Sequence, residues 1–358
     1  MFNRLRALLR FWRWVRRWRR PVTTNVVAQA GPKRPTQHHF IILDGTLSSL
    51  QPGRETNAGL TYKLLREVAR EQKVSLYYEP GLQWYDWRSG LDVIVGRGIN
   101  RQIRRAYSVL SSRYRPGDKI TLIGYSRGAF AVRSLGGIVS RVGLLRYDCA
   151  TERAVRTAYR HYQLGASPDV IQAFSDAYCH KEIEIEMVGV WDTVKALGLK
   201  IPGNIARTEA VHAFHDDRLS NLVRHGFQAL ALNEKRAAFS PILWISDPNW
   251  TGHALEQVWF RGHHGDIGGH QAGYSEARPL ANIPLVWMLE KILACGTKLP
   301  EDWQSRFVQD PNAPSAGLWR GPGIFAWRRK IRRVGADVSE QVHNTVPKLE
   351  AEARLERS

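Results

Sequence analysis

Cysteine is scarce in this chain. Its three occurrences, Cys149, Cys179 and Cys295, lie far apart and form no CxxC pair. Three separated cysteines exclude a disulfide framework and a zinc ribbon, and they fit a reducing cytoplasm. We therefore expect three small buried hydrophobic side chains, with no bound metal and no other cofactor.

Long apolar runs are also lacking. No uninterrupted apolar stretch approaches the roughly 20 residues that cross a bilayer. Residues 1–20 hold eight arginines and no acidic residue, so arginine recurs where a signal peptide would have its apolar core. The sequence therefore predicts neither a transmembrane helix nor a secretory signal peptide, and export would have to proceed without one.

Residues 1–20, which we call the basic arm, combine arginine with tryptophan. On a helical wheel most apolar residues gather on one side and most arginines on the other. This pattern predicts an interfacial helix on an anionic membrane, with indole rings in the headgroup zone. A disordered basic arm that touches nucleic acid is the alternative, and tryptophan disfavours it. The expected location is cytoplasmic with peripheral membrane association. The residues expected at the membrane are Trp12, Trp14, Trp18, Arg13 and Arg17.

Positive charge exceeds negative charge along the whole chain. The 358 residues include 52 Lys and Arg against 33 Asp and Glu, a formal net charge of +19. Such a surface attracts nucleic acid, anionic lipid headgroups or an acidic partner, and charge alone does not choose among them. The 43% of hydrophobic residues is enough for a sizeable core.

The apolar pattern divides the chain into segments. Residues 21–37 are expected to be a linker, 38–300 one domain, and 301–358 a C-terminal extension with basic and charged segments. Strands alternating with helices predict an α/β fold with a mainly parallel sheet. The expected strands are 38–43, 74–78, 119–124, 183–190 and 257–261, and the expected helices are 57–69, 99–114, 129–142, 152–162, 219–233 and 283–294.

A G-x-S-x-G run carries the strongest chemical signal. Gly124-Tyr125-Ser126-Arg127-Gly128 follows an apolar, β-branched strand and precedes small helix-forming residues. A nucleophile elbow needs this context, because the serine sits on a strained strand-to-helix turn and the glycines allow close backbone approach. The motif predicts an α/β-hydrolase-like fold, flanked by helices, with Ser126 as nucleophile.

A serine hydroxyl needs a base and an orienting acid, which elbow hydrolases supply in the order serine, acid, histidine. Asp192 follows one expected strand, and His263 and His264 follow another. Asp192 is the candidate acid, although an Asp before Thr also commonly caps a turn. Spacing does not decide between the two histidines. His263, His264 and Asp266 are an alternative set of metal ligands, a less favoured interpretation because one loop rarely builds a metal site. Other acids and bases lie at His212, His215, Asp216 and Asp217.

An oxyanion hole needs two backbone donors. One is expected from Arg127, the residue after the nucleophile, and one from Gly45 or Thr46, just after the first strand. Asp44-Gly45-Thr46 also suits an ordinary tight turn, and the two interpretations are compatible.

Six segments together resemble a known family. The similarity spans about Phe40 to Met288 and is to the α/β-hydrolase catalytic domain of type VI secretion lipase effectors of the first class, a family otherwise made up largely of uncharacterised bacterial proteins. It implies a Ser-Asp-His hydrolase that cleaves phospholipid acyl esters. In this chain the resemblance assigns Ser126 as nucleophile, Asp192 as acid and His264, not His263, as base. The segments are LDGT (43–46), GYSRGAFAVRSLGG (124–137), GVWDTVKALG (189–198), HAFHDDRL (212–219), ALALNEKR (229–236) and VWFRGHHGDIGG (258–269).

The function expected from the sequence is therefore ester hydrolysis, most of all of phospholipid acyl esters at a membrane surface, without a cofactor. Two alternatives stay open. One is a non-catalytic basic binding protein on a hydrolase scaffold, because fold does not imply function. The other is a metal-dependent phosphoesterase that uses the histidine-rich loop. The sequence specifies no oligomeric state.

Overall fold

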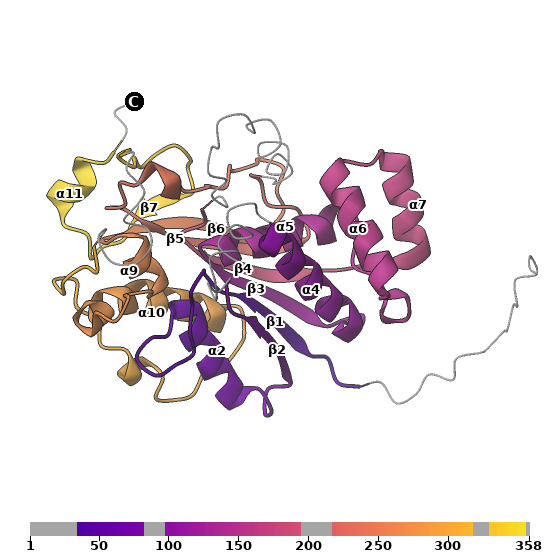
Figure 1. The fold of residues 1–358 in the computed structure, drawn as a ribbon, viewed down its shortest axis with the longest axis horizontal. Coiled ribbons are helices and arrows are strands. Elements are labelled where there is room, and N and C mark those ends of the chain that lie inside the picture. Colours follow the sequence, from indigo (N-terminus) through magenta and orange to yellow (C-terminus); the bar gives the residue numbers. More distant parts are fainter. Residues whose placement is uncertain (1–33, 82–96, 195–216, 318–328, 356–358) are drawn as a thin grey trace, which may run out of the picture. The chain divides into compact units, whose positions relative to one another are not determined.

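Seven strands form one parallel sheet in the computed structural model, which describes residues 34–81, 97–194, 217–317 and 329–355. The chain from Thr36 to Ser358 is one compact unit. The basic arm and most of the expected linker lie outside the described residues. The strand order is β2-β1-β3-β4-β5-β6-β7 (Figure 1). The strands are β1 (His38–Leu43), β2 (Val74–Glu79), β3 (Lys119–Tyr125), β4 (Ile185–Trp191), β5 (Val223–Ala231), β6 (Ala254–Phe260) and β7 (Glu340–Val342).

The central strands are apolar on both sides because helices cover both faces of the sheet. In β1, Ile41 and Leu43 face one core cluster, whereas Phe40 and Ile42 face the other. The first face is covered by α4 (Arg97–Arg113) and α5 (Arg127–Arg141), and α6 (Glu152–Leu164) packs against these two helices. The helix α7 (Pro168–Tyr178) follows and adds Phe174 to the same core cluster. The second is covered by α2 (Asn57–Val68), α9 (His264–Gly268) and α10 (Arg278–Ala294) (Figure 1). The last helix is α11 (Lys348–Glu352).

The register of the sheet brings several loops to one edge. Leu43 pairs with Gly124, and Trp191 pairs with both Tyr125 and Ala229. Since the strands are parallel, the segments after β1, β3, β4, β5 and β6 all begin at this carboxyl edge, where ligands bind in open α/β sheets.

The expected helix at 219–233 is wrong: Val223–Ala231 is strand β5, between β4 and β6. Six consecutive residues from Gly226 are buried, and a strand covered on both faces has no alternation that distinguishes it from a buried helix. The helices α7 and α9 and the strand β7 were not expected from the sequence.

Residues beyond 300, expected to be an extension, belong to the same unit as the sheet. Their strand β7 pairs with β6 and forms one edge of the sheet. None of the described helices is both long and apolar enough to span a membrane.

Candidate active site

Ser126 lies at the turn between β3 and α5, as expected. Its backbone has φ 57° and ψ −118°, the strained conformation of an elbow. A Cβ added to Gly128 would lie 2.0 Å from the Leu43 carbonyl oxygen, and one added to Gly124 would lie 2.7 Å from the Ala129 nitrogen. Both glycines are therefore required by the close approach of backbone on either side of Ser126.

Asp192 follows β4 and is fully buried. Its backbone N–H donates to the Ala229 carbonyl at 2.7 Å, and its Oδ1 accepts from the Ala231 N–H at 3.1 Å. The side chain is thus held against the end of β5 and does not cap its own turn, which was the alternative role considered for it.

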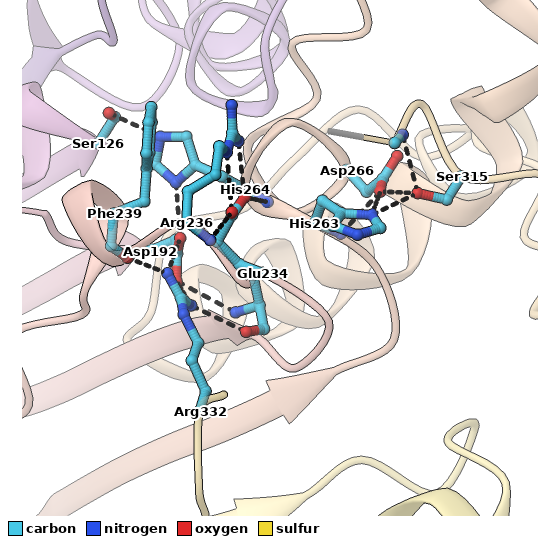
Figure 2. Close-up of polar contacts among 12 residues, drawn as sticks. Ser126, Asp192, Glu234, Arg236, Phe239, His263, His264, Asp266, Ser315 and Arg332 are labelled. Carbon is cyan, nitrogen blue, oxygen red and sulfur yellow. Dashed lines mark hydrogen bonds and ion pairs between the residues drawn. The ribbon is translucent and has the colours of Figure 1, made fainter. Parts of the chain in front are cut away.

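His264 connects the two. Its Nδ1 lies 2.6 Å from Asp192 Oδ2, and its Nε2 lies 2.8 Å from Ser126 Oγ (Figure 2). An ionised carboxylate only accepts hydrogen bonds, so Nδ1 carries the proton and the Nε2 lone pair faces the serine hydroxyl. This arrangement can remove the proton of Ser126 as its oxygen attacks a carbonyl carbon.

His263 has a different set of partners. It precedes α9 as the N-cap, and its N–H donates to Asp266 Oδ2 at 2.8 Å. Its Nδ1 lies 2.9 Å from Ser315 Oγ, away from Ser126 (Figure 2). The backbone of Ala316 also donates to Asp266. These contacts attach the loop after β6 to residues 315–316, and the structure brings only the second histidine of the pair to the serine.

The three residues of the metal alternative do not converge on one point. His263 Nδ1 and the carboxylate of Asp266 both bond to Ser315 Oγ, whereas His264 Nδ1 bonds to Asp192. Among the described residues, one group has ligand atoms close enough for a metal ion, Glu186, His225 and Cys295. There Glu186 already pairs with the Lys119 ammonium at 2.9 Å. His212, His215 and Asp216 lie outside the described residues.

Arg332 is a site residue that sequence reasoning missed. Its Nη1 lies 2.6 Å from Asp192 Oδ1 and its Nη2 lies 3.0 Å from Asp192 Oδ2 (Figure 2). Burial raises the pKa of Asp192, but the charge of Arg332 and the bond from His264 outweigh it and hold that pKa well below its usual range. Asp192 is therefore an anion. No local pattern distinguishes Arg332 from its basic neighbours in the sequence.

A second buried carboxylate supports the backbone of His264. Glu234 is fully buried, and its Oε2 accepts from the His264 N–H at 3.2 Å. Burial raises its pKa, yet the bidentate pair with Arg236 lowers it to about 2. Phe239 packs edge-on to the imidazole, with ring centroids 4.9 Å apart. Segment 229–236 contributed to the family resemblance, but the sequence assigned no role to this pair.

The loop after β1 passes close to the elbow. A Cβ on Gly45 would lie 3.4 Å from Ser126 Cβ. The Gly45 N–H, however, donates to Asp44 Oδ1 at 2.6 Å. Of the two expected oxyanion donors in this loop, Thr46 is therefore the better candidate, together with the N–H of Arg127 at the start of α5.

Residues 37–291 match the family "T6SS, Phospholipase effector Tle1-like, catalytic domain". The chain belongs to this family. The resemblance inferred from the sequence is thereby confirmed, as is the α/β fold. Ser126, Asp192, Glu234 and His264 all lie inside the matched Tle1-like domain, whereas Arg332 lies beyond it.

Individual relatives are distant. The uncharacterized protein YEL023C of Saccharomyces cerevisiae is 27% identical, over 58% of this chain and 33% of that protein. An uncharacterized protein from Pseudomonas aeruginosa has a structure with TM-score 0.42 at 15% identity, covering 77% of this chain and 49% of that one. The Tle1 effector bound to the VgrG spike of the type 6 secretion system gives TM-score 0.35 at 20% identity, covering 65% and 51%. The chain thus spans a third to a half of these proteins.

Proposed function

We propose that this chain is a serine hydrolase that cleaves the acyl esters of phospholipids. The observation that carries the proposal is the continuous hydrogen-bonded chain from Ser126 through His264 to Asp192 at the carboxyl edge of the sheet. Membership of a family described as phospholipase effectors supports the substrate class.

The geometry supports an acyl-enzyme mechanism. Ser126 Oγ attacks the ester carbonyl while His264 Nε2 takes its proton, and Asp192 stabilises the imidazolium. The carbonyl oxygen becomes an oxyanion, for which the N–H groups of Arg127 and Thr46 are the proposed donors. The imidazolium then protonates the departing alcohol. A water molecule, deprotonated by the same nitrogen, releases the fatty acid and regenerates Ser126.

The proposed site of action is the surface of an anionic membrane. The basic arm supplies the expected anchor, since its arginines and tryptophans suit a headgroup layer. We propose a cytoplasmic, peripherally associated protein. A non-catalytic binding protein would not need an elbow serine aligned with a histidine that a buried aspartate orients, and this observation favours the enzyme.

The first prediction concerns Ser126→Ala. We expect loss of hydrolysis of about a million-fold on a short-chain ester, because the substitution removes the oxygen that His264 would activate. A fluorophosphonate probe should label wild type at Ser126 and should not label the variant. Mass spectrometry of the labelled peptide identifies the modified residue.

The matched control is Ser112→Ala, the same chemical change on the exposed face of α4, which should keep full activity. Retention of more than about a tenth of wild-type turnover by Ser126→Ala would refute the proposal. Activity lost on treatment of wild type with a chelator, with Ser126→Ala still active, would favour the metal-dependent alternative.

A further inference from the structure

Arg332 makes a set of contacts that the proposed mechanism does not use. The side chain is only 4% exposed, and its guanidinium donates to both carboxylate oxygens of Asp192. It also donates to the carbonyls of Ala231, at 2.8 Å, and Phe239. We propose that Arg332 is a positioning residue of the hydrolase site, which fixes the orientation and tunes the charge of Asp192; this inference rests on the proposed function.

The first part of the argument is geometric. A guanidinium is a planar fork that matches the two oxygens of a carboxylate, so a bidentate pair fixes the rotation of the acid. Asp192 Oδ2 accepts from Arg332 and from His264 at the same time. If the carboxylate rotated, Oδ2 would leave the line to His264 Nδ1. Arg332 thereby holds the imidazole indirectly, through Asp192, and its hydrogen bonds go to Asp192, Ala231 and Phe239.

The second part is electrostatic. Asp192 is fully buried and needs a compensating charge to stay ionised. Arg332 supplies it, and in doing so it limits how strongly Asp192 stabilises the imidazolium of His264. Of the other titratable groups, Tyr125 interacts electrostatically with Asp192, and Glu234 and His270 interact with His264. Glu234 and Arg236 pair with each other, so Arg332 is the cation whose removal leaves Asp192 uncompensated.

The third part is the placement of Arg332 in the fold. The backbone N–H of Lys330 donates to the Lys235 carbonyl at 2.7 Å, next to Glu234. The backbone N–H of Val334 donates to the Arg354 carbonyl at 2.9 Å. Residues 330–334 are therefore attached on one side to the loop after β5 and on the other to the last described turn of the chain. Residues 330–334 lie outside the family-matched region, and they place the side chain of Arg332 against Asp192.

The test compares three full-length variants. Arg332→Met removes the charge, Arg332→Lys keeps the charge but loses the fork, and Arg333→Met makes the same charge change at an exposed neighbour. The pH profile of kcat/KM and the values of kcat and KM are measured with a soluble short-chain ester. Thermal unfolding shows whether each variant is folded.

We expect Arg332→Met to lose activity about ten- to a hundredfold, the range seen for outer partners that orient metal-binding histidines. The acid limb of its profile should move to higher pH by about one unit, because the buried histidine–aspartate pair binds a further proton more readily without a cation beside it. Arg332→Lys should lower kcat with little change in KM and keep the wild-type acid limb. Arg333→Met should match wild type.

A folded Arg332→Met variant with the wild-type pH profile would overturn the proposal, as would Arg332→Lys with full turnover. If Arg332→Met does not fold, the lysine variant alone decides. Failure of the proposed function is recognised separately, by a wild type as inactive as Ser126→Ala. The titration midpoint of the His264 ring, followed by NMR in the full chain, then tests Arg332 without turnover: it should rise in Arg332→Met.

Discussion

His263 and His264 are neighbours in sequence but have different partners. The carboxyl end of β6 directs one ring to Ser315 and the other to Ser126 and Asp192. The first histidine therefore stabilises a loop, and only the second lies between the elbow serine Ser126 and Asp192.

The second prediction follows from this difference. His264→Ala should lower turnover nearly as much as Ser126→Ala, because members of one catalytic unit fail together. His263→Ala should keep more than about a tenth of wild-type activity, since it removes a bond to Ser315 and leaves the base in place. Steady-state hydrolysis of a short-chain ester measures both, and the opposite order would show that the base is misassigned.

Asp44 is a buried acid beside the same loop edge. Its carboxylate accepts from Tyr78 and Thr56 at 2.7 and 2.5 Å and from the Gly45 N–H. Burial raises its pKa from 3.8 to about 6, although these bonds oppose the rise. A carboxyl whose pKa is raised on folding favours the folded protein when protonated, so its contribution to stability falls as the pH rises from about 4 to about 6.

The third prediction is that Asp44→Asn removes the loss of stability that ionisation of Asp44 causes as the pH rises. A shift of about 2 units corresponds to about 3 kcal/mol. Because the unfolded carboxyl is already partly ionised at pH 4, the free energy of unfolding of Asp44→Asn, relative to wild type, should increase by about 2 to 2.5 kcal/mol between pH 4 and pH 7. Urea unfolding at the two pH values measures it. Asp148→Asn, at an exposed position, is the control, and a pH-independent difference between Asp44→Asn and wild type would contradict the prediction.

At the scale of elements, α5 sits directly on the carboxyl end of β1. Gly128, in its first turn, meets the backbone carbonyl of Leu43, while Gly136, two turns later, has ordinary space around it. A Cβ at Gly136 would lie 3.6 Å from Leu122 Cδ1. Replacement of glycine by alanine is therefore expected to affect stability differently at Gly128 and at Gly136.

The fourth prediction compares Gly128→Ala with Gly136→Ala. The first should destabilise the protein by about 1–3 kcal/mol and reduce turnover, because α5 must move away from β1 and carries Ser126 with it. The second should be neutral or stabilising by up to about 1 kcal/mol, since alanine favours a helix more than glycine does. Denaturant unfolding and ester hydrolysis measure both. Equal stability of the two variants would show that the elbow tolerates a side chain.

At the scale of the whole molecule, the basic arm contributes eight arginines and no acidic residue to the net charge of +19. Near an anionic leaflet each arginine contributes about 1 kcal/mol at low ionic strength, and ordering the arm costs about 1–2 kcal/mol per residue. The two effects oppose each other, so we expect modest, reversible and salt-sensitive membrane binding.

The fifth prediction is that deletion of residues 1–20 weakens binding to anionic vesicles and leaves hydrolysis of a soluble ester nearly unchanged. Vesicle co-sedimentation at low and high salt measures the first, and the ester assay is the control for the fold. A deleted protein that binds vesicles as tightly as wild type would exclude the arm as anchor. Tighter binding of the intact chain to duplex DNA than to vesicles would support the nucleic-acid alternative.

Local signals in the sequence were enough for the elbow, for most of the helices and strands, and for the N-cap of α2, where Thr56 accepts from the Gly59 N–H. Each of these features depends on residues a few positions apart, so it can be predicted without knowledge of long-range contacts. The choice of His264 needed the family resemblance, because spacing alone treats adjacent histidines alike.

Only the tertiary structure decided the rest. Strand β5 is covered on both faces, so its apolar run is indistinguishable from a buried helix until its neighbours are known. The sequence also made Gly45 an expected oxyanion donor, but in the structure its N–H donates to Asp44 Oδ1. Arg332 lies 140 residues from Asp192 along the chain, and no local pattern marks one arginine among many as the partner of a distant acid. Such pairs form only when the sheet brings strand ends and the end of the chain to one place.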